Sequence, residues 1–222
     1  MLIDSIFGPV NTNNCYVIAE IGINHEGSFD TCAKMVVAAA SAGADAIKLQ
    51  TIDPDRNYSP LSESYDLFKK SMLSQEETSN IFRIAKSYHL EAFTTVGDLE
   101  TLDWIKKLNP ACYKISSGLL TCIPIIEEAA KLGKPMLMST GMAKHSDISA
   151  ACDTVLGLGN RRTALFQCTS KYPAKNEDLN LSTIGWLRNF FKCPVGFSDH
   201  SKGDFASTLA VASGAVMIEK HI

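Results

Sequence analysis

The feature that most constrains the fold of this chain is a short, nearly continuous apolar run that recurs eight times, each run separated from the next by an amphipathic segment. Strands that are apolar along their whole length are typical of a parallel sheet covered by helices. Right-handed crossovers between successive strands would close eight of them into a barrel. The sequence therefore predicts an α/β fold, a TIM-type (β/α)8 barrel. The runs cover residues 16–23, 46–50, 91–96, 112–116, 135–139, 164–168, 194–198 and 216–221.

The segments between the runs carry helix start and stop signals. Ser74 and Glu77 have the spacing of a capping box, Asp98 is placed to cap the next helix, and Pro124 suits a first helical turn. A doubly wound open sheet is the competing architecture, but no Gly-x-Gly-x-x-Gly motif follows the first run, which argues against a dinucleotide-binding fold. Three glycines stand where a left-handed helix C-cap is needed before a strand: Gly43, Gly133 and Gly214.

The two ends of the chain differ from the repeating pattern. Residues 1–15, with Gly8, Pro9 and several asparagines, are expected to form an N-terminal hairpin or lid across the bottom of the barrel. Residues 16–222 form the predicted barrel. The sequence stops at Ile222, directly after the eighth run, so we expect a barrel that lacks its last helix and a piece of a longer enzyme.

Composition narrows the functional classes. A formal net charge of −3 argues against nucleic acid or an anionic membrane as the main partner. No apolar run is long enough to span a bilayer, and no basic segment followed by a hydrophobic stretch begins the chain. The seven cysteines are scattered without a Cys-x-x-Cys pair, which favours reduced thiols. We therefore expect a cytoplasmic enzyme.

Polar residues gather at the C-terminal ends of the predicted strands, where parallel barrels place their chemistry. Lys48 and Lys114 lie within otherwise apolar strands, and a buried ammonium group needs an anion. One interpretation pairs each lysine with Glu20 or Asp199 inside the barrel. The other is a clamp for a phosphate and a carboxylate of the substrate. Hydroxyl groups can donate hydrogen bonds to phosphate oxygens in such a clamp without adding charge, and the candidates are those of Thr95, Ser117, Ser139 and Ser198.

Two histidines end the seventh and eighth predicted strands. Neighbouring strands lie about 4.8 Å apart, so the imidazoles of His200 and His221 can reach one metal ion and leave positions open to water and substrate. Such a site suits Mn²⁺ or another divalent cation acting as a Lewis acid. The alternative is two hydrogen-bonded core histidines without a metal.

Seven stretches, in the same order across nearly the whole chain, resemble the N-acetylneuraminate (sialic acid) synthases and their legionaminate and pseudaminate relatives. This resemblance implies the condensation of phosphoenolpyruvate with N-acetylmannosamine or a related amino sugar and water, which gives a nonulosonic acid and phosphate. The stretches are residues 19–27 (AEIGINHEG), 46–51 (AIKLQT), 113–118 (YKISSG), 139–142 (STGM), 168–173 (CTSKYP), 196–200 (GFSDH) and 219–221 (EKH).

The resemblance also implies roles for individual residues. Glu20 and Asp199 are the carboxylates available for proton transfer, Gln50 and Tyr172 would contact the sugar, and His200 with His221 would hold the metal, Mn²⁺ or else Mg²⁺ or Co²⁺. The full-length protein is expected to be a homodimer. Phosphoenolpyruvate would be held by Lys48, Thr95, Lys114, Ser117, Ser139, Ser170 and Ser198.

The sequence departs from the family pattern at strand four and at its end. Leu119 stands where the family usually has a carboxylate, which bears on sugar binding. The acidic residue expected beyond strand eight and the family's antifreeze-like C-terminal domain are not in the sequence. Two other functions stay open: a pyruvate aldolase with Lys114 as its Schiff-base amine, and a non-catalytic barrel remnant that binds phosphoenolpyruvate or a partner.

Overall fold

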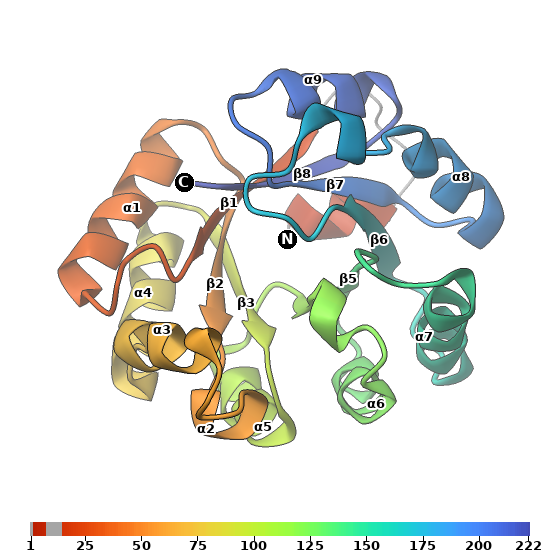
Figure 1. Cartoon of the computed structure of the whole chain (residues 1–222). Helices are drawn as coiled ribbons and strands as arrows, with labels where there is room; N and C mark the ends of the chain where they lie inside the picture. Colours follow the sequence, from red (N-terminus) through yellow and green to blue (C-terminus); the bar gives the residue numbers. More distant parts are fainter. Residues whose placement is uncertain (1, 8–14) are drawn as a thin grey trace.

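The strands of the computed structural model, which describes residues 2–7 and 15–222, form a closed parallel barrel in chain order (Figure 1). β8 pairs with β1 and so closes the sheet, which confirms the barrel and excludes the open sheet. Every strand agrees with its predicted run to within one residue at each end. The strands are β1 Tyr16–Gly22, β2 Ala46–Thr51, β3 Glu91–Val96, β4 Tyr113–Ile115, β5 Met136–Ser139, β6 Thr163–Cys168, β7 Val195–Asp199 and β8 Met217–His221.

Helices surround the barrel (Figure 1), and the predicted caps are present. Ser74 and Glu77 form the capping box, Asp98 accepts a hydrogen bond from the backbone N–H of Thr101, and Pro124 lies in the first turn of its helix. No helix within the described residues is long and apolar enough to cross a bilayer. The α-helices are α1 Phe29–Ser41, α2 Pro54–Asn57, α3 Glu63–Ser71, α4 Gln75–Ser87, α5 Leu99–Ile105, α6 Ile123–Lys131, α7 His145–Gly157, α8 Ser182–Phe191 and α9 Phe205–Ala212.

Short 3₁₀ helices complete the described chain: η1 Leu2–Phe7, η2 Lys106–Leu108, η3 Ser117–Leu119 and η4 Asn176–Asp178. η1 belongs to the segment predicted as a hairpin or lid. Residues 2–7 are helical and therefore not a hairpin strand. Residues 8–14 of that prediction lie outside the described residues. The backbone N–H of Ile3 and the hydroxyl of Tyr16 donate to the same Glu91 carboxylate oxygen, at 2.8 and 2.7 Å. η1 therefore covers the N-terminal end of the barrel.

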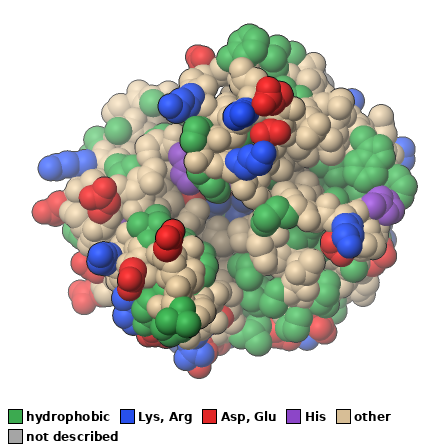
Figure 2. Space-filling model, viewed as in Figure 1, with side chains coloured by type: hydrophobic (Ala, Val, Ile, Leu, Met, Phe, Trp, Pro, Cys, Tyr) green, Lys and Arg blue, Asp and Glu red, His purple; other side chains and the backbone are tan. Residues whose placement is uncertain are grey.

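The opposite end of the barrel faces the viewer in Figures 1 and 2, because η1 lies behind the strands. Here the strands end and the long connections to the helices begin. The surface is hollowed at its centre, and basic side-chain atoms lie at the bottom of the hollow (Figure 2). The C-terminal ends of the strands therefore surround an open, basic depression.

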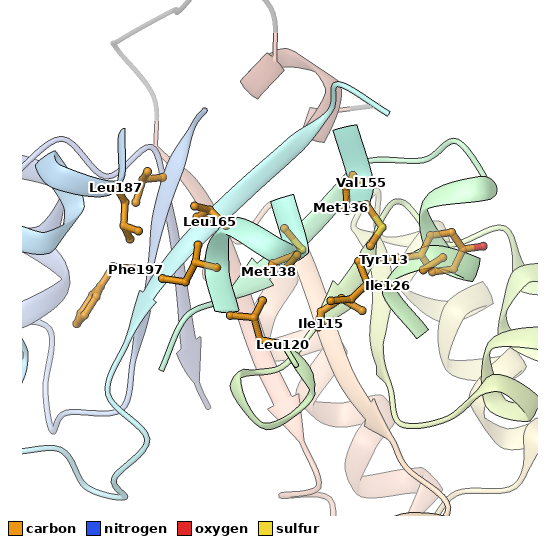
Figure 3. Close-up of a cluster of buried hydrophobic side chains, with 14 of the residues drawn as sticks. Tyr113, Ile115, Leu120, Ile126, Met136, Met138, Val155, Leu165, Leu187 and Phe197 are labelled. Carbon is orange, nitrogen blue, oxygen red and sulfur yellow. The ribbon is translucent and has the colours of Figure 1, made fainter. Parts of the chain in front are cut away.

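The largest apolar cluster packs the outer faces of β4 to β7 against α6, α7 and α8 (Figure 3). Tyr113, Ile115, Met136, Met138 and Phe197 point outward from their strands in this cluster. Because side chains alternate along a strand, the residues between or beside them point into the barrel. Packing of the outer shell therefore fixes Lys114, Leu137, Ser139 and Ser198 as inward-facing positions.

The connection from β2 to α4 carries α2 and α3, and α3 packs against the loop after β1. Gly27 of that loop has φ +79°, and a Cβ atom built there would clash with the carbonyl oxygen of Lys70. We expect Gly27→Ala to lower the free energy of unfolding by about 2–5 kcal/mol, the sum of a left-handed alanine and a backbone clash. Thermal or urea unfolding measures this effect.

The matched control is Gly43→Ala. Gly43 has φ +82°, but no atom lies within 4 Å of the position that an alanine Cβ would take there, so only the left-handed strain of about 1–2 kcal/mol applies. Equal losses in the two variants would show that the close contact with Lys70 contributes nothing to the stability of this connection.

Candidate active site

Inward-facing polar residues from neighbouring strands lie side by side next to the apolar side chains that fill the rest of the barrel interior. Glu20 is the register partner of Lys48, Thr95 is the partner of Lys114, and Ser198 is the partner of Glu219. All six side chains are buried, and each belongs to a residue exposed by no more than 3%. The barrel thus encloses two amines and two carboxylates with hydroxyls between them.

The two lysines share one carboxylate. The amine of Lys48 lies 3.2 Å from Glu20 Oε2 and 3.1 Å from Glu219 Oε1, and the amine of Lys114 lies 3.0 Å from the same Glu219 oxygen. The interpretation of lysines paired inside the barrel is therefore correct for Lys48 and Glu20. The main partner, Glu219, was not among the predicted site residues. It lies two residues before His221, so strand alternation places both on the inner face of β8.

The buried charges shift one another's protonation. Burial raises the pKa of Glu20 to about 7, although the charge of Lys48 opposes the shift. For Glu219 burial also favours the neutral acid, but the ammonium groups of Lys114 and Lys48 prevail and lower its pKa. Burial lowers the pKa of Lys114, whose amine also lies 5.2 Å from the ring centre of Phe166. Glu219 is thus the fixed anion, and Glu20 is able to exchange a proton near neutral pH.

Several buried polar atoms of the cluster have no hydrogen-bond partner within the described chain: Thr95 Oγ1, Ser139 Oγ and Glu219 Oε2. A buried polar group that is left unsatisfied costs about 1–3 kcal/mol, so such atoms usually face a ligand or water. Two hydroxyl donors beside two amines match the oxygens of an anionic ligand.

A second group of hydroxyls closes around the loop after β5. Ser117 Oγ accepts a hydrogen bond from the backbone N–H of Gly141 at 3.0 Å. A Cβ atom at Gly141 would lie 2.6 Å from Ser170 Oγ and 2.7 Å from Ser117 Oγ, so only glycine allows this approach. The structure therefore brings Ser117 and Ser170 together across Gly141. Leu119, at the end of η3, packs against the outer apolar cluster.

His200 and His221 lie together at the rim, with their ring centres 5.5 Å apart. His200 Nδ1 is 2.7 Å from the carbonyl oxygen of Thr169, which accepts the Nδ1 proton and leaves Nε2 with its lone pair. Tyr172 stacks on this ring at 4.1 Å, and its hydroxyl lies 3.1 Å from His200 Nε2. The ring of His200 is hydrogen-bonded, as the alternative prediction holds for this residue, and it also presents a ligand nitrogen. The ring of His221 packs beside the rings of Tyr172 and His200.

The imidazoles are neutral at physiological pH, as metal ligands must be. Burial lowers the pKa of His200, and burial together with the nearby His200 lowers the pKa of His221 to about 4. Within residues 2–7 and 15–222 no three His, Cys, Asp or Glu side chains converge as a metal site. Gln50 donates to Glu20 Oε1 at 3.1 Å, so this predicted sugar contact lies beside the charged cluster.

Asp199 does not belong to this cluster, which corrects its predicted catalytic role. Ser198 faces the barrel, so the next residue faces the helices. One Asp199 oxygen accepts from the N–H and hydroxyl of Ser201, and the other accepts from Ser207 and pairs with Lys220. A carboxylate held by four donors on the outer face of β7 has no access to a substrate in the barrel.

Comparison with known proteins finds relatives that match nearly the whole length of this chain. An uncharacterized protein of Methanocaldococcus jannaschii is 41% identical over 206 residues, which cover 93% of this chain and 61% of that protein. The N,N'-diacetyllegionaminic acid synthase of Legionella pneumophila is 36% identical, with coverage of 93% and 63%. The chain thus spans a little over three fifths of the length of these relatives.

A solved structure and a family model show the same relationship. The N-acetylneuraminic acid (sialic acid) synthetase of Leptospira borgpetersenii, crystallised with citrate, superposes with a TM-score of 0.91 at 33% identity, covering 95% of this chain and 73% of that chain. The model of the NeuB family matches residues 35–222. That span contains Lys48, Lys114, Glu219 and both rim histidines. This chain belongs to the NeuB family.

Proposed function

We propose that this barrel condenses phosphoenolpyruvate with an N-acetylated amino sugar aldehyde, N-acetylmannosamine or a relative of it, and water to give a nonulosonic acid and phosphate. The observation that carries the proposal is the pair of buried amines, Lys48 and Lys114, beside the unpartnered hydroxyls of Thr95 and Ser139. The names of the relatives, a legionaminic acid synthase and a sialic acid synthetase, support the same reaction.

Phosphoenolpyruvate would complete the hydrogen bonding of the cluster. Its carboxylate and phosphate oxygens suit the amines of Lys48 and Lys114, which Glu219 already holds in place. The hydroxyls of Thr95 and Ser139 then gain acceptors. Ser198, whose hydroxyl donates to Glu219, completes the support of that carboxylate. Ser117 and Ser170, which meet across Gly141, provide further donors on the β4 and β6 sides.

Bond formation follows from this placement. C3 of phosphoenolpyruvate, the nucleophilic end of the enol, attacks the aldehyde carbon, and positive charge develops at C2, where water adds. The tetrahedral carbon then expels phosphate by cleavage of its C–O bond. Glu20 is the carboxylate suited to proton transfer, because burial raises its pKa to about 7, near the operating pH of an acid–base catalyst. Gln50, which donates to Glu20, and Tyr172, which stacks on His200, would contact the sugar.

A divalent metal, Mn²⁺ or else Mg²⁺ or Co²⁺, fits the two rim histidines. The bond from His200 Nδ1 to Thr169 fixes the tautomer whose Nε2 binds a metal, and the low pKa of His221 keeps that ring neutral. When bound, such an ion supplies Lewis acidity toward the sugar aldehyde. The remaining coordination positions would be taken by water and substrate oxygens, because the described residues offer no third His, Cys, Asp or Glu.

The test is phosphate release from phosphoenolpyruvate with Mn²⁺ and a panel of N-acetylated amino sugars, followed for this chain and for the product of the complete gene. We expect release that requires both a sugar and the metal, and that falls at least about a hundredfold in His221→Ala, as when a positioned catalytic group is lost. A protein that binds phosphoenolpyruvate and never releases phosphate would instead be the non-catalytic remnant.

The aldolase alternative is less consistent with the site. A Schiff-base lysine must be a free amine, whereas Lys114 donates to Glu219 at 3.0 Å as an ammonium group. Its pKa is lowered by burial, which is the feature that favours the alternative. Borohydride reduction with pyruvate separates the two: a covalent adduct on Lys114 would contradict the proposal, and we expect none.

We also propose that the full-length enzyme is a cytoplasmic homodimer. All seven cysteines are free thiols, which is consistent with a reducing compartment. The dimer rests on the family resemblance. Light scattering on the product of the complete gene measures its mass in solution and would reveal a monomer.

A further inference from the structure

The residues directly before the two rim histidines form an ion pair on the outer face of the barrel. Asp199 precedes His200 and Lys220 precedes His221, and the two are register partners in adjacent strands. The Lys220 amine lies 3.0 Å from Asp199 Oδ2. Since side chains alternate along strands, this pair lies behind the two imidazoles, on the opposite face of the sheet.

The Asp199 carboxylate also holds the turn that carries His200. Its Oδ1 atom accepts from the backbone N–H of Ser201 at 2.8 Å and from the Ser201 hydroxyl at 2.6 Å. Its Oδ2 atom accepts from Ser207, in the first turn of α9, at 2.6 Å. The residue is only 1% exposed. His200 thus lies in the chain between Asp199 and Ser201, which are hydrogen-bonded to each other.

Lys220 joins that turn to β8. Besides the ion pair, its amine donates to the carbonyl oxygen of Ser201 at 2.8 Å. The ladder between β7 and β8 ends at Asp199 and Lys220, so no backbone pair between these strands lies beyond them in the described chain. His200 and His221 come one residue later. The ion pair is therefore the last link between β7 and β8 before the two imidazoles.

The remaining restraints on the histidines come from other elements. The His200 carbonyl accepts from the N–H of Ala174, and its ring is bonded to Thr169, both in the β6–α8 loop. His221 pairs with Glu20 of β1. Each histidine is thus fixed to a different neighbour. The ring of Tyr172 contacts both imidazoles at the rim, and the Asp199–Lys220 pair joins the two strands behind them.

We propose that Asp199 and Lys220 are positioning residues that hold His200 and His221 at metal-binding separation, a role that rests on the proposed metal site. Asp199 faces away from the barrel interior, where its carboxylate is held by Ser201, Ser207 and Lys220. Replacing an outer-shell residue that orients metal ligands typically changes metal affinity 10–100-fold. Replacement of this pair therefore weakens metal binding. It leaves intact the buried lysines and hydroxyls on the inner face, which are proposed to bind phosphoenolpyruvate.

The experiment measures Mn²⁺ affinity by electron paramagnetic resonance and phosphoenolpyruvate affinity by calorimetry without metal, on the whole chain. We expect Asp199→Asn to raise the Kd for Mn²⁺ about 10–100-fold and to change the Kd for phosphoenolpyruvate less than about twofold. Lys220→Met should also raise the Kd for Mn²⁺, and Lys220→Arg, which keeps the charge, should restore most of the affinity. Asp103→Asn, in an exposed pair with Lys106, is the control and should change neither constant.

The outcomes separate the two proposals. A wild-type chain that binds no Mn²⁺ would overturn the metal site and this inference with it. A wild type that binds Mn²⁺, with Asp199→Asn and Lys220→Met that bind it equally well, would overturn only the positioning role. Equal losses of Mn²⁺ and phosphoenolpyruvate affinity would show general loosening of the fold and also contradict the role. If Asp199→Asn does not fold, Lys220→Met and Lys220→Arg decide the question.

Discussion

Lys114→Met is expected to lower kcat/KM for phosphoenolpyruvate at least about a thousandfold while the melting temperature stays the same or rises. The activity falls because a charge-assisted donor to the substrate is removed from a buried position in the site. The fold tolerates the change because methionine fits the space beside Phe166, and Glu219 keeps Lys48 and Ser198 as partners. Replacing a buried ionic group with an apolar one is often neutral or stabilising.

Phosphate-release kinetics and calorimetric melting of the same preparations measure the two effects. Lys131→Met is the matched control, since Lys131 is an exposed lysine of α6 paired with Glu127 and Glu128. It should leave kcat/KM unchanged and stability within about 1 kcal/mol. Activity within tenfold of wild type in Lys114→Met would mean that this amine does not bind the substrate, and the proposed phosphoenolpyruvate site would be wrong.

Glu219→Gln should produce the largest loss of stability in the site. The change removes the anion shared by Lys48 and Lys114 and leaves two buried ammonium groups with Glu20 as the one remaining carboxylate of the cluster. Breaking a buried ion pair from one side costs about 3–5 kcal/mol. In a domain of this size that corresponds to a melting temperature lower by roughly 6–20 °C. Scanning calorimetry at pH 7 measures the shift.

Glu20→Gln is the matched control for this variant. Because burial raises the pKa of Glu20 to about 7, part of the wild-type population already carries a neutral acid there at pH 7. Removing the charge of Glu20 should therefore reduce stability less than removing the charge of Glu219. Inorganic phosphate should raise the melting temperature of Glu219→Gln more than that of wild type, since the uncompensated amines gain an anion. Equal destabilisation by the two variants would contradict the central position of Glu219.

The strands could be predicted closely because each one is buried on both faces, and β3 Glu91–Val96 lies where its apolar run does. The clustering of Lys48 and Lys114 could be predicted because both lysines lie within otherwise apolar strands of the same barrel. The error at Asp199 came from treating strand ends as uniformly catalytic. Since Ser198 was already assigned to the interior, alternation alone places Asp199 outside.

Other features of the site depend on contacts that no local pattern contains. Glu219 was missed because its partners lie on β2 and β4, and their distance across the barrel interior depends on strand tilt and register. The tautomer of His200 depends on Thr169 in an irregular loop after β6. The 3₁₀ conformation of η1 and its attachment to Glu91 were not predicted, because Glu91 lies 88 residues after Ile3 in the chain. Long-range contacts of this kind become visible only when the fold is known.

The alternation between inner and outer faces has a consequence for how this family can vary. Deleting one residue within β4 or β7 would exchange the two faces beyond it, so that Lys114 or Ser198 would enter the apolar shell and Tyr113 or Phe197 would enter the charged interior. We therefore expect the connections, such as the one that carries α2 and α3, to tolerate changes of length that the strands do not. Insertion or loss of whole segments there would alter the rim of the site while the strands keep a constant number of residues.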